Sequence, residues 1–100
     1  MHARLLRMEL VVDRVREVEE LFSRDIIPLC QKQDGFRGAY FLKEPKTGEC
    51  IAITFWKDEE SMLASERNHF FQEQVAKLLR FYTAVPVRET YEVVVKDKGA

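Results

Sequence analysis

Four stretches of the chain place apolar residues at every second position, the spacing typical of β-strands. These predicted strands are residues 3–12, 36–43, 49–56 and 87–96. Between the second and third, Pro45 and Gly48 predict a tight turn, so these two strands are expected to be antiparallel neighbours. In the third strand one set of side chains shares a face, and the alternate set shares the other. The two sets are Ile51, Ile53 and Phe55 against Cys50, Ala52, Thr54 and Trp56.

Two longer stretches repeat their apolar residues at three- and four-residue spacing, which predicts amphipathic helices. The first is expected to begin at an Asp13 N-cap and to end near residue 33, with Pro28 kinking or breaking it close to Ile27. Its apolar stripe is Val15, Val18, Phe22, Ile26 and Leu29. The second is expected to begin at an Asp58 N-cap, to bend within residues 65–68 and to end near residue 82. Its apolar stripe is Phe71, Val75, Leu78, Leu79 and Tyr82.

The order of these elements, β-α-β-β-α-β, predicts an α+β fold of the ferredoxin-like type, in which both helices cover one face of an antiparallel sheet. Residues 1–100 are expected to form this single domain. The uncovered face is expected to carry Trp56, Thr54, Cys50, Val11 and Val94 among its charges. An apolar face of that size marks an interface. We therefore expect a homodimer that forms through the sheet face.

The amino-acid composition argues against several classes of protein and of binding partner. The chain is 46% hydrophobic and 33% charged with a net charge of −1, which argues against disorder and predicts no affinity for nucleic acid or for an anionic membrane. No apolar stretch approaches the roughly 20 residues that span a bilayer, and the N-terminus lacks a signal-peptide pattern. Cys30 and Cys50 fit neither a zinc site nor a disulfide framework. A reduced, cytoplasmic protein is expected.

Three segments carry a family resemblance: residues 34–40, the strand end Thr54-Phe55-Trp56, and residues 58–61. Together they resemble the antibiotic biosynthesis monooxygenase-like family of the dimeric α+β barrel superfamily. The resemblance implies a dimeric α+β barrel. It also implies a place among cofactor-independent quinone-forming monooxygenases, haem-degrading enzymes and small-ligand isomerases.

The haem-degrading members of that superfamily have an asparagine on the first strand, a tryptophan in the second helical segment and a histidine further along. This chain has Arg7 or Glu9, Ser65 and Val75 near those places. The resemblance therefore disfavours haem degradation. The sequence also lacks metal-ligand spacing and a phosphate-cradling glycine loop. No cofactor is expected.

His69, Arg37 and Tyr40 are the candidate catalytic residues. His69 has Glu66 and Glu73 at helical spacing, either of which could orient it as a general base. Arg37 could hold a carboxylate or phenolate through two hydrogen bonds, and Tyr40 could donate to a carbonyl. Each has a common structural alternative, namely an exposed histidine, a solvated arginine and a tyrosine bonded to backbone.

Trp56, Phe71 and Tyr82 are the candidate substrate-binding residues, because aromatic side chains stack on planar compounds and shape pocket walls. Packing in the core or at an interface is their structural alternative. Two functions remain open at this point. One is the cofactor-independent oxidation of a small planar aromatic or quinol-type compound in a pocket between helices and sheet. The other is a non-catalytic dimeric module that binds a small ligand or serves a structural role.

Overall fold

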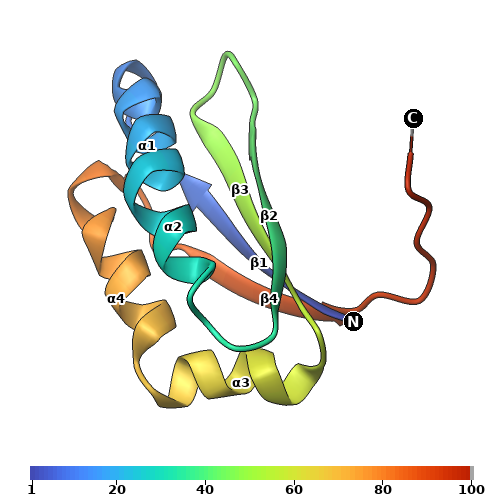
Figure 1. The fold of residues 1–100 in the computed structure, drawn as a ribbon. Helices are drawn as coiled ribbons and strands as arrows, with labels where there is room; N and C mark the ends of the chain where they lie inside the picture. The colour runs from blue at the N-terminus through green and yellow to red at the C-terminus, as the bar shows by residue number, and fades with distance from the viewer. Residues whose placement is uncertain (100) are drawn as a thin grey trace.

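The computed structural model describes residues 1–99 and contains one four-stranded antiparallel sheet. Its strands are β1 (His2–Glu9), β2 (Phe36–Lys43), β3 (Glu49–Trp56) and β4 (Val87–Glu92), arranged in the order β2-β3-β1-β4. Both helical segments lie on the same side of the sheet (Figure 1). This is the predicted ferredoxin-like α+β arrangement.

The first helical segment follows a continuous path that changes its winding. It consists of η1 (Val12–Arg14), α1 (Val15–Leu21), the π-helical stretch η2 (Phe22–Ile26) and α2 (Ile27–Cys30). Pro28 lies in the first turn of α2 and does not break the helix. The π-helical stretch in front of it shifts carbonyls to donors five residues on, which accommodates the missing N–H of the proline. The Asp13 N-cap prediction is wrong, because Asp13 lies within η1 and no side chain caps that turn.

The second helical segment is divided into α3 (Glu59–Arg67), α4 (Phe70–Lys77) and the 3-10 turn η3 (Leu79–Phe81). Asp58 caps α3 as predicted, since its Oδ1 accepts a hydrogen bond from the Ser61 backbone N–H at 2.8 Å. The bend falls at Asn68 and His69, at the end of the predicted range, where His69 adopts a left-handed conformation with φ of 67°. The chain then turns sharply from α3 into α4 (Figure 1).

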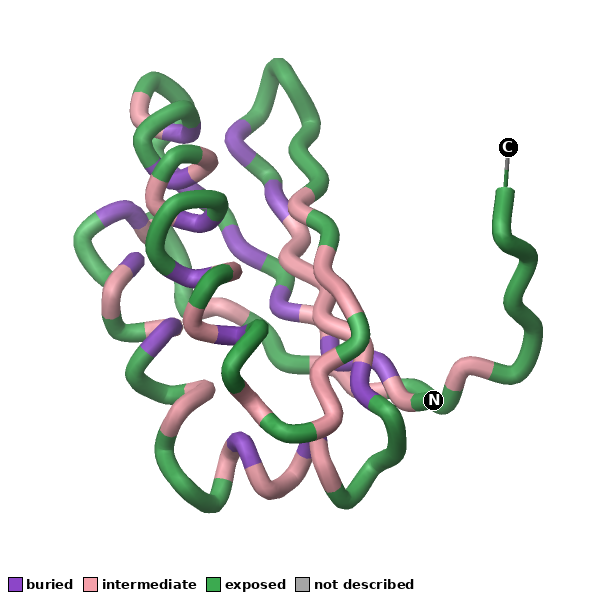
Figure 2. Tube along the Cα trace, in the orientation of Figure 1, coloured by how far each residue is buried: buried purple, intermediate pink, exposed green. Residues whose placement is uncertain are grey.

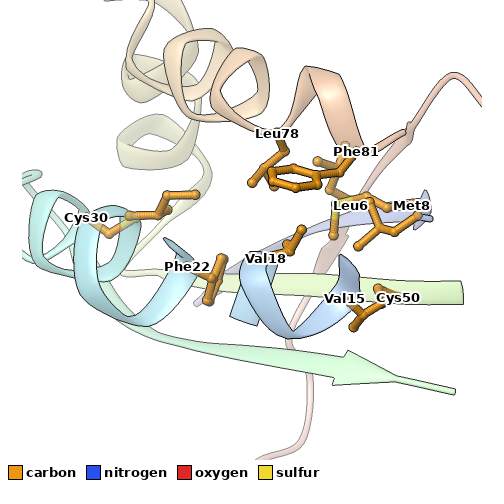
Figure 3. Packing of buried hydrophobic residues seen from close by; sticks show 11 residues of the cluster. Leu6, Met8, Val15, Val18, Phe22, Cys30, Cys50, Leu78 and Phe81 are labelled. Carbon is orange, nitrogen blue, oxygen red and sulfur yellow. The ribbon is translucent and has the colours of Figure 1, made fainter. Parts of the chain in front are cut away.

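The hydrophobic core fills the space between the helices and the sheet. Purple, buried positions line the facing sides of both layers in Figure 2, and Figure 3 shows how their side chains meet. The cluster consists of Leu6, Met8, Leu10, Val15, Val18, Phe22, Ile26, Cys30, Cys50, Leu78 and Phe81. Leu79 was expected in the core but is 71% exposed, whereas Phe81 is 1% exposed. The change from α4 to the tighter η3 rotates the apolar stripe at this point.

One prediction about the sheet is wrong: Cys50, Thr54 and Trp56 do not lie on the uncovered face. They pair with Met8, Arg4 and His2 of β1, whose side chains face the helices. Trp56 is fully buried and Cys50 nearly so. Both side-chain sets of β3 are largely apolar. The alternation along a strand shows which residues share a face, but it does not show which of the two faces the helices cover.

The uncovered face, which we call the open face, is defined by the other set of pairings. Its apolar residues are Leu5, Tyr40, Leu42, Ile51, Ile53, Phe55, Val87 and Tyr91. Toward β4 it also carries an ion pair between Arg7 and Glu89. The last strand ends at Glu92 rather than at residue 96. The chain beyond it first borders the end of the open face that carries Tyr40 and Phe55 and then extends outward (Figure 1).

Candidate functional site

A cavity of about 50 Å³ lies between the helical layer and the covered face of the sheet. Apolar side chains from both helical segments and from the sheet form most of its wall. The lining includes Arg4, Thr54, Phe70, Phe71, Gln74 and Val75. The cavity therefore occupies the place where a pocket was expected.

Arg4 is a charged residue in the wall of this cavity. It lies near the middle of β1, on the face that packs against the helices, and its side chain is 4% exposed. Its Nη1 donates to Ser65 Oγ and to Glu66 Oε2, each at 3.0 Å, and to the Met62 carbonyl oxygen at 3.4 Å. Helix α3 thus supplies the acceptors that make burial of this arginine possible.

Two aromatic rings hold the Arg4 guanidinium in place. Its central carbon lies 4.0 Å from the centre of the Phe71 ring and 5.3 Å from the centre of the Trp56 ring. Both distances are in the range of cation–π attraction. Trp56 is itself fixed, because its Nε1 donates to Thr54 Oγ1 at 3.0 Å and its ring meets Phe36 edge to face.

Two arginines and one glutamate form an ionic cluster beside the cavity. Burial lowers the pKa of the Arg4 guanidinium, and the neighbouring Glu66 opposes that change. A guanidinium nevertheless keeps its proton in proteins at neutral pH. Arg88 Nη2 also bonds Glu66 Oε2, at 2.7 Å, so two arginines share one carboxylate. The three side chains together carry a net charge of +1.

The predicted substrate-binding residues are divided between this site and its surroundings. Phe71 lines the cavity. Trp56 does not line it but contacts two residues that do, Arg4 and Thr54. Tyr82 is not part of the lining. Its hydroxyl donates to the Val75 carbonyl oxygen at 3.1 Å, and burial raises its pKa to about 12. The Tyr82 hydroxyl is therefore bonded to the backbone, which is the structural alternative to a role in substrate binding.

The structure does not bring the three predicted catalytic residues together. Arg37 is exposed at the irregularity near the start of β2, where it donates to the Phe36 carbonyl oxygen. His69 is exposed at the bend between α3 and α4. Tyr40 is 63% exposed on the open face. None of the three lines the cavity.

Sequence reasoning missed Arg4, and a signal for it was present. Arg4 occupies the same alternate positions as Leu6 and Met8, so a charge stands in a run of side chains that is otherwise apolar. A charged residue at such a position is rarely buried without a partner. Its partners, Ser65 and Glu66, are about 60 residues away and could be found only from the fold.

The described residues were compared with the requirements of a metal site and of a membrane-spanning helix. Within residues 1–99, no group of three or more His, Cys, Asp or Glu side chains is placed to hold a metal ion. Among the helices described, none is long and apolar enough to cross a membrane.

Residues 1–77 match the family model for antibiotic biosynthesis monooxygenases. The chain belongs to the antibiotic biosynthesis monooxygenase family. This finding confirms the resemblance drawn from the sequence. It assigns the family over more than three quarters of the chain and leaves the reaction unspecified. No match was found among curated protein sequences.

Several solved structures share the fold of this chain at low sequence identity. A monooxygenase from Streptomyces coelicolor, in complex with the ligand nanaomycin D, has a TM-score of 0.75 and 12% identity over 99% of this chain and 92% of its own. SnoaB, a cofactor-independent oxygenase from Streptomyces nogalater, has a TM-score of 0.76 and 16% identity over 98% and 97%. MhuD, a heme-degrader from Mycobacterium tuberculosis with two hemes bound, has a TM-score of 0.73 and 17% identity over 97% and 99%.

Proposed function

We propose that this chain is a monooxygenase-like protein that binds a small planar aromatic or quinol-type compound in the cavity and oxidises it without a cofactor. The observation that carries the proposal is the cavity itself, a mostly apolar space with a buried arginine held between two aromatic rings. Pockets for small molecules combine such an apolar wall with a few fixed polar groups. Support comes from two relatives of the same fold, an oxygenase named as cofactor-independent and a monooxygenase bound to nanaomycin D.

The proposed reaction converts a phenolic ring to a quinone and balances without a further reductant. The substrate loses its phenolic proton and one ring hydrogen and supplies four electrons to O₂. One oxygen atom becomes the new carbonyl group, and the other leaves as water. The protein's part is to bind and orient the ring, with Arg4 as the polar anchor and Phe71 as the stacking wall.

The cavity must widen to accept such a compound. Its volume of about 50 Å³ is well below the roughly 300–1,000 Å³ of pockets that hold drug-sized ligands. Phe70 and Phe71 follow the bend at His69 and are only partly buried. We assign the opening of the cavity to these two side chains.

The second function left open by the sequence, a non-catalytic ligand-binding module, is also supported by one observation. Among the described residues that line the cavity there is no histidine, aspartate or glutamate to act as a general base. The nearby Glu66 is bound to Arg4 and Arg88. In either case we propose that a second copy of the chain covers the open face, because an exposed apolar face of this extent is typical of an interface.

Binding and turnover assays separate the two functions. Trp56 is the only tryptophan and contacts Arg4, so its fluorescence should report ligand entry. We expect 1-naphthol and naphthohydroquinone to change this fluorescence in a saturable way and to cause O₂ uptake above the rate without protein. Phe71→Ala should weaken binding roughly tenfold. Leu79→Ala, at an exposed position on η3, should not.

Three outcomes are distinct. Binding with O₂ uptake supports the oxygenase, and binding without O₂ uptake supports the non-catalytic module. No saturable binding of either compound would overturn both.

A further inference from the structure

Arg4 has hydrogen-bond donors that its protein partners do not use. A guanidinium carries five N–H donors, three of them on Nε and Nη2. Each hydrogen bond that Arg4 makes within residues 1–99 starts from Nη1. In the same part of the chain, no fully buried side-chain nitrogen or oxygen lacks a partner. Nε and Nη2 are therefore not sealed from accessible space, and Arg4 is one of the residues that line the cavity.

Cationic side chains gather beside the cavity. Glu66 neutralises one of the two arginines that it bonds, and none of the described residues lining the cavity is acidic. A further cation lies close by, because Lys77 Nζ donates to the Oε1 of the cavity residue Gln74 at 2.9 Å. Arg4 itself is paired with Glu66, and Arg88, which shares that carboxylate, is partly exposed to solvent. A negative charge inside the cavity would face these cations and no acidic side chain of the described lining.

The guanidinium is also fixed in orientation. Phe71 and Trp56 flank it, and three acceptors from α3 bind one of its ends. A fixed guanidinium presents two parallel N–H groups that match the two oxygens of a carboxylate. The rest of the cavity wall, including Leu6, Ile26 and Val75, suits an apolar body.

We infer that the ligand of this site is a planar apolar acid, whose carboxylate pairs with Nε and Nη2 of Arg4 while its ring lies against the apolar wall. This inference rests on the proposed use of the cavity for a small aromatic compound and names the chemical class of that compound. It does not depend on whether the compound is oxidised.

The test compares an acid with its neutral counterpart. Benzoate and benzamide have the same ring and nearly the same shape, and calorimetry measures the affinity of the protein for each at pH 7. We expect benzoate to bind on the order of tenfold more tightly than benzamide or better, since a charge-assisted bidentate pair replaces a neutral contact. The preference should persist at moderate salt because the site is buried.

Variants assign the preference to Arg4. Arg4→Met should abolish the preference for benzoate. Arg4→Lys keeps the charge without the two parallel N–H groups and should reduce the preference. It serves as the test if Arg4→Met does not fold. The matched control is Arg67→Met, which removes one arginine from α3 at an exposed position, where it pairs with Glu60. This variant should retain the parent's preference.

The results that would overturn the inference are definite. They are equal affinity for the two compounds, no binding of either, or a benzoate preference that survives in both Arg4 variants. If only the proposed oxidation is wrong, benzoate would still bind through Arg4, but no phenolic compound would cause O₂ uptake. Oxidation of neutral phenols without any preference for the acid would overturn this inference and leave the oxygenase intact.

Discussion

The two faces of β3 are both apolar, yet they lie in different surroundings. On the covered face, Trp56 and Cys50 are buried by helices of the same chain, and Thr54 borders a cavity that holds a charged arginine. On the open face, Ile53 and Phe55 are only partly buried, and none of the described helices covers them. The chain after β4 borders this face only at the end that carries Tyr40 and Phe55. A small sheet can thus bury a charge where its own helices supply acceptors. An exposed apolar face such as the other one is typical of an interface, and we propose that a second copy of the chain lies there.

The largest effect is expected from removing the tryptophan of the covered face. Trp56→Ala should lower the free energy of unfolding by about 3–5 kcal/mol, because it leaves a large cavity and removes the ring that packs on Phe36 and Arg4. Urea denaturation measures the loss. Tyr40→Ala on the open face should change it by no more than about 0.5 kcal/mol when subunits are separated by dilution. Equal losses at the two positions would contradict the assignment of the faces.

The next largest effect concerns assembly. Ile53 pairs with Leu5 and Tyr40 at the centre of the open face. Ile53→Lys should leave the circular dichroism spectrum unchanged and convert a dimer to a monomer of about half its mass, since a lysine would be buried unpaired in the interface. Light scattering after size exclusion measures the mass.

Gln31→Lys adds the same charge at an exposed helix end and serves as the control for assembly. It should leave the mass unchanged. If the parent protein is a monomer at all accessible concentrations, or if Ile53→Lys keeps the parent's mass, the open face is not the interface.

The two cysteines provide a test of the faces that requires no large substitution. Burial raises the pKa of the Cys30 thiol to about 11 and raises that of Cys50 as well. Because the thiolate is the reactive form, Cys30 should react with Ellman's reagent at pH 8 on the order of a hundredfold more slowly in the folded protein than in urea. Cys50 should also react more slowly in the folded protein. Cys30→Ser isolates Cys50. A rapid reaction of Cys50 in this folded variant would place it on an exposed surface.

Sequence alone was sufficient for the parts of the fold that depend on local chemistry. The second and third strands, the Gly48 turn and the Asp58 cap follow from neighbouring residues, and each is present in the structure. The α+β order followed from periodicity, and the family from short segments that the family model confirms over residues 1–77.

The parts that could not be predicted depend on contacts between distant residues. Which side of β3 is covered is decided by its pairing with β1, and both of its sides are equally apolar in the sequence. The burial of Arg4 depends on Ser65 and Glu66, which only the fold brings to it. His69, Arg37 and Tyr40 were selected for their chemistry alone. The fold places Arg37 and Tyr40 beside one surface hollow and His69 apart from them, at the bend between α3 and α4. A site in a small domain is thus defined more by what packs around a residue than by its type.

The smallest expected effect tests the helix that supports the covered face. Asp58 caps α3, the helix that carries Ser65 and Glu66, and the hydrogen bond from the Ser61 backbone N–H lowers the pKa of its carboxyl group. Because the folded-state pKa lies below the unfolded value of about 3.9, the stabilising effect of the charge is fully present above that value. It is lost as the pH falls through the lower folded-state pKa.

Asp58→Asn keeps a capping oxygen and removes only the charge. Its urea midpoint should therefore lie slightly below the parent's at pH 7 and converge with it as the pH falls through the folded-state pKa of Asp58. Asp34→Asn, an exposed loop aspartate, removes the same charge without a cap and should show no such convergence. A difference between Asp58→Asn and the parent that grows toward acid would contradict the sign. Since α3 packs on the covered side, neither substitution should alter the mass of the assembly, whereas a change of mass in Asp58→Asn alone would show that the two faces are not independent.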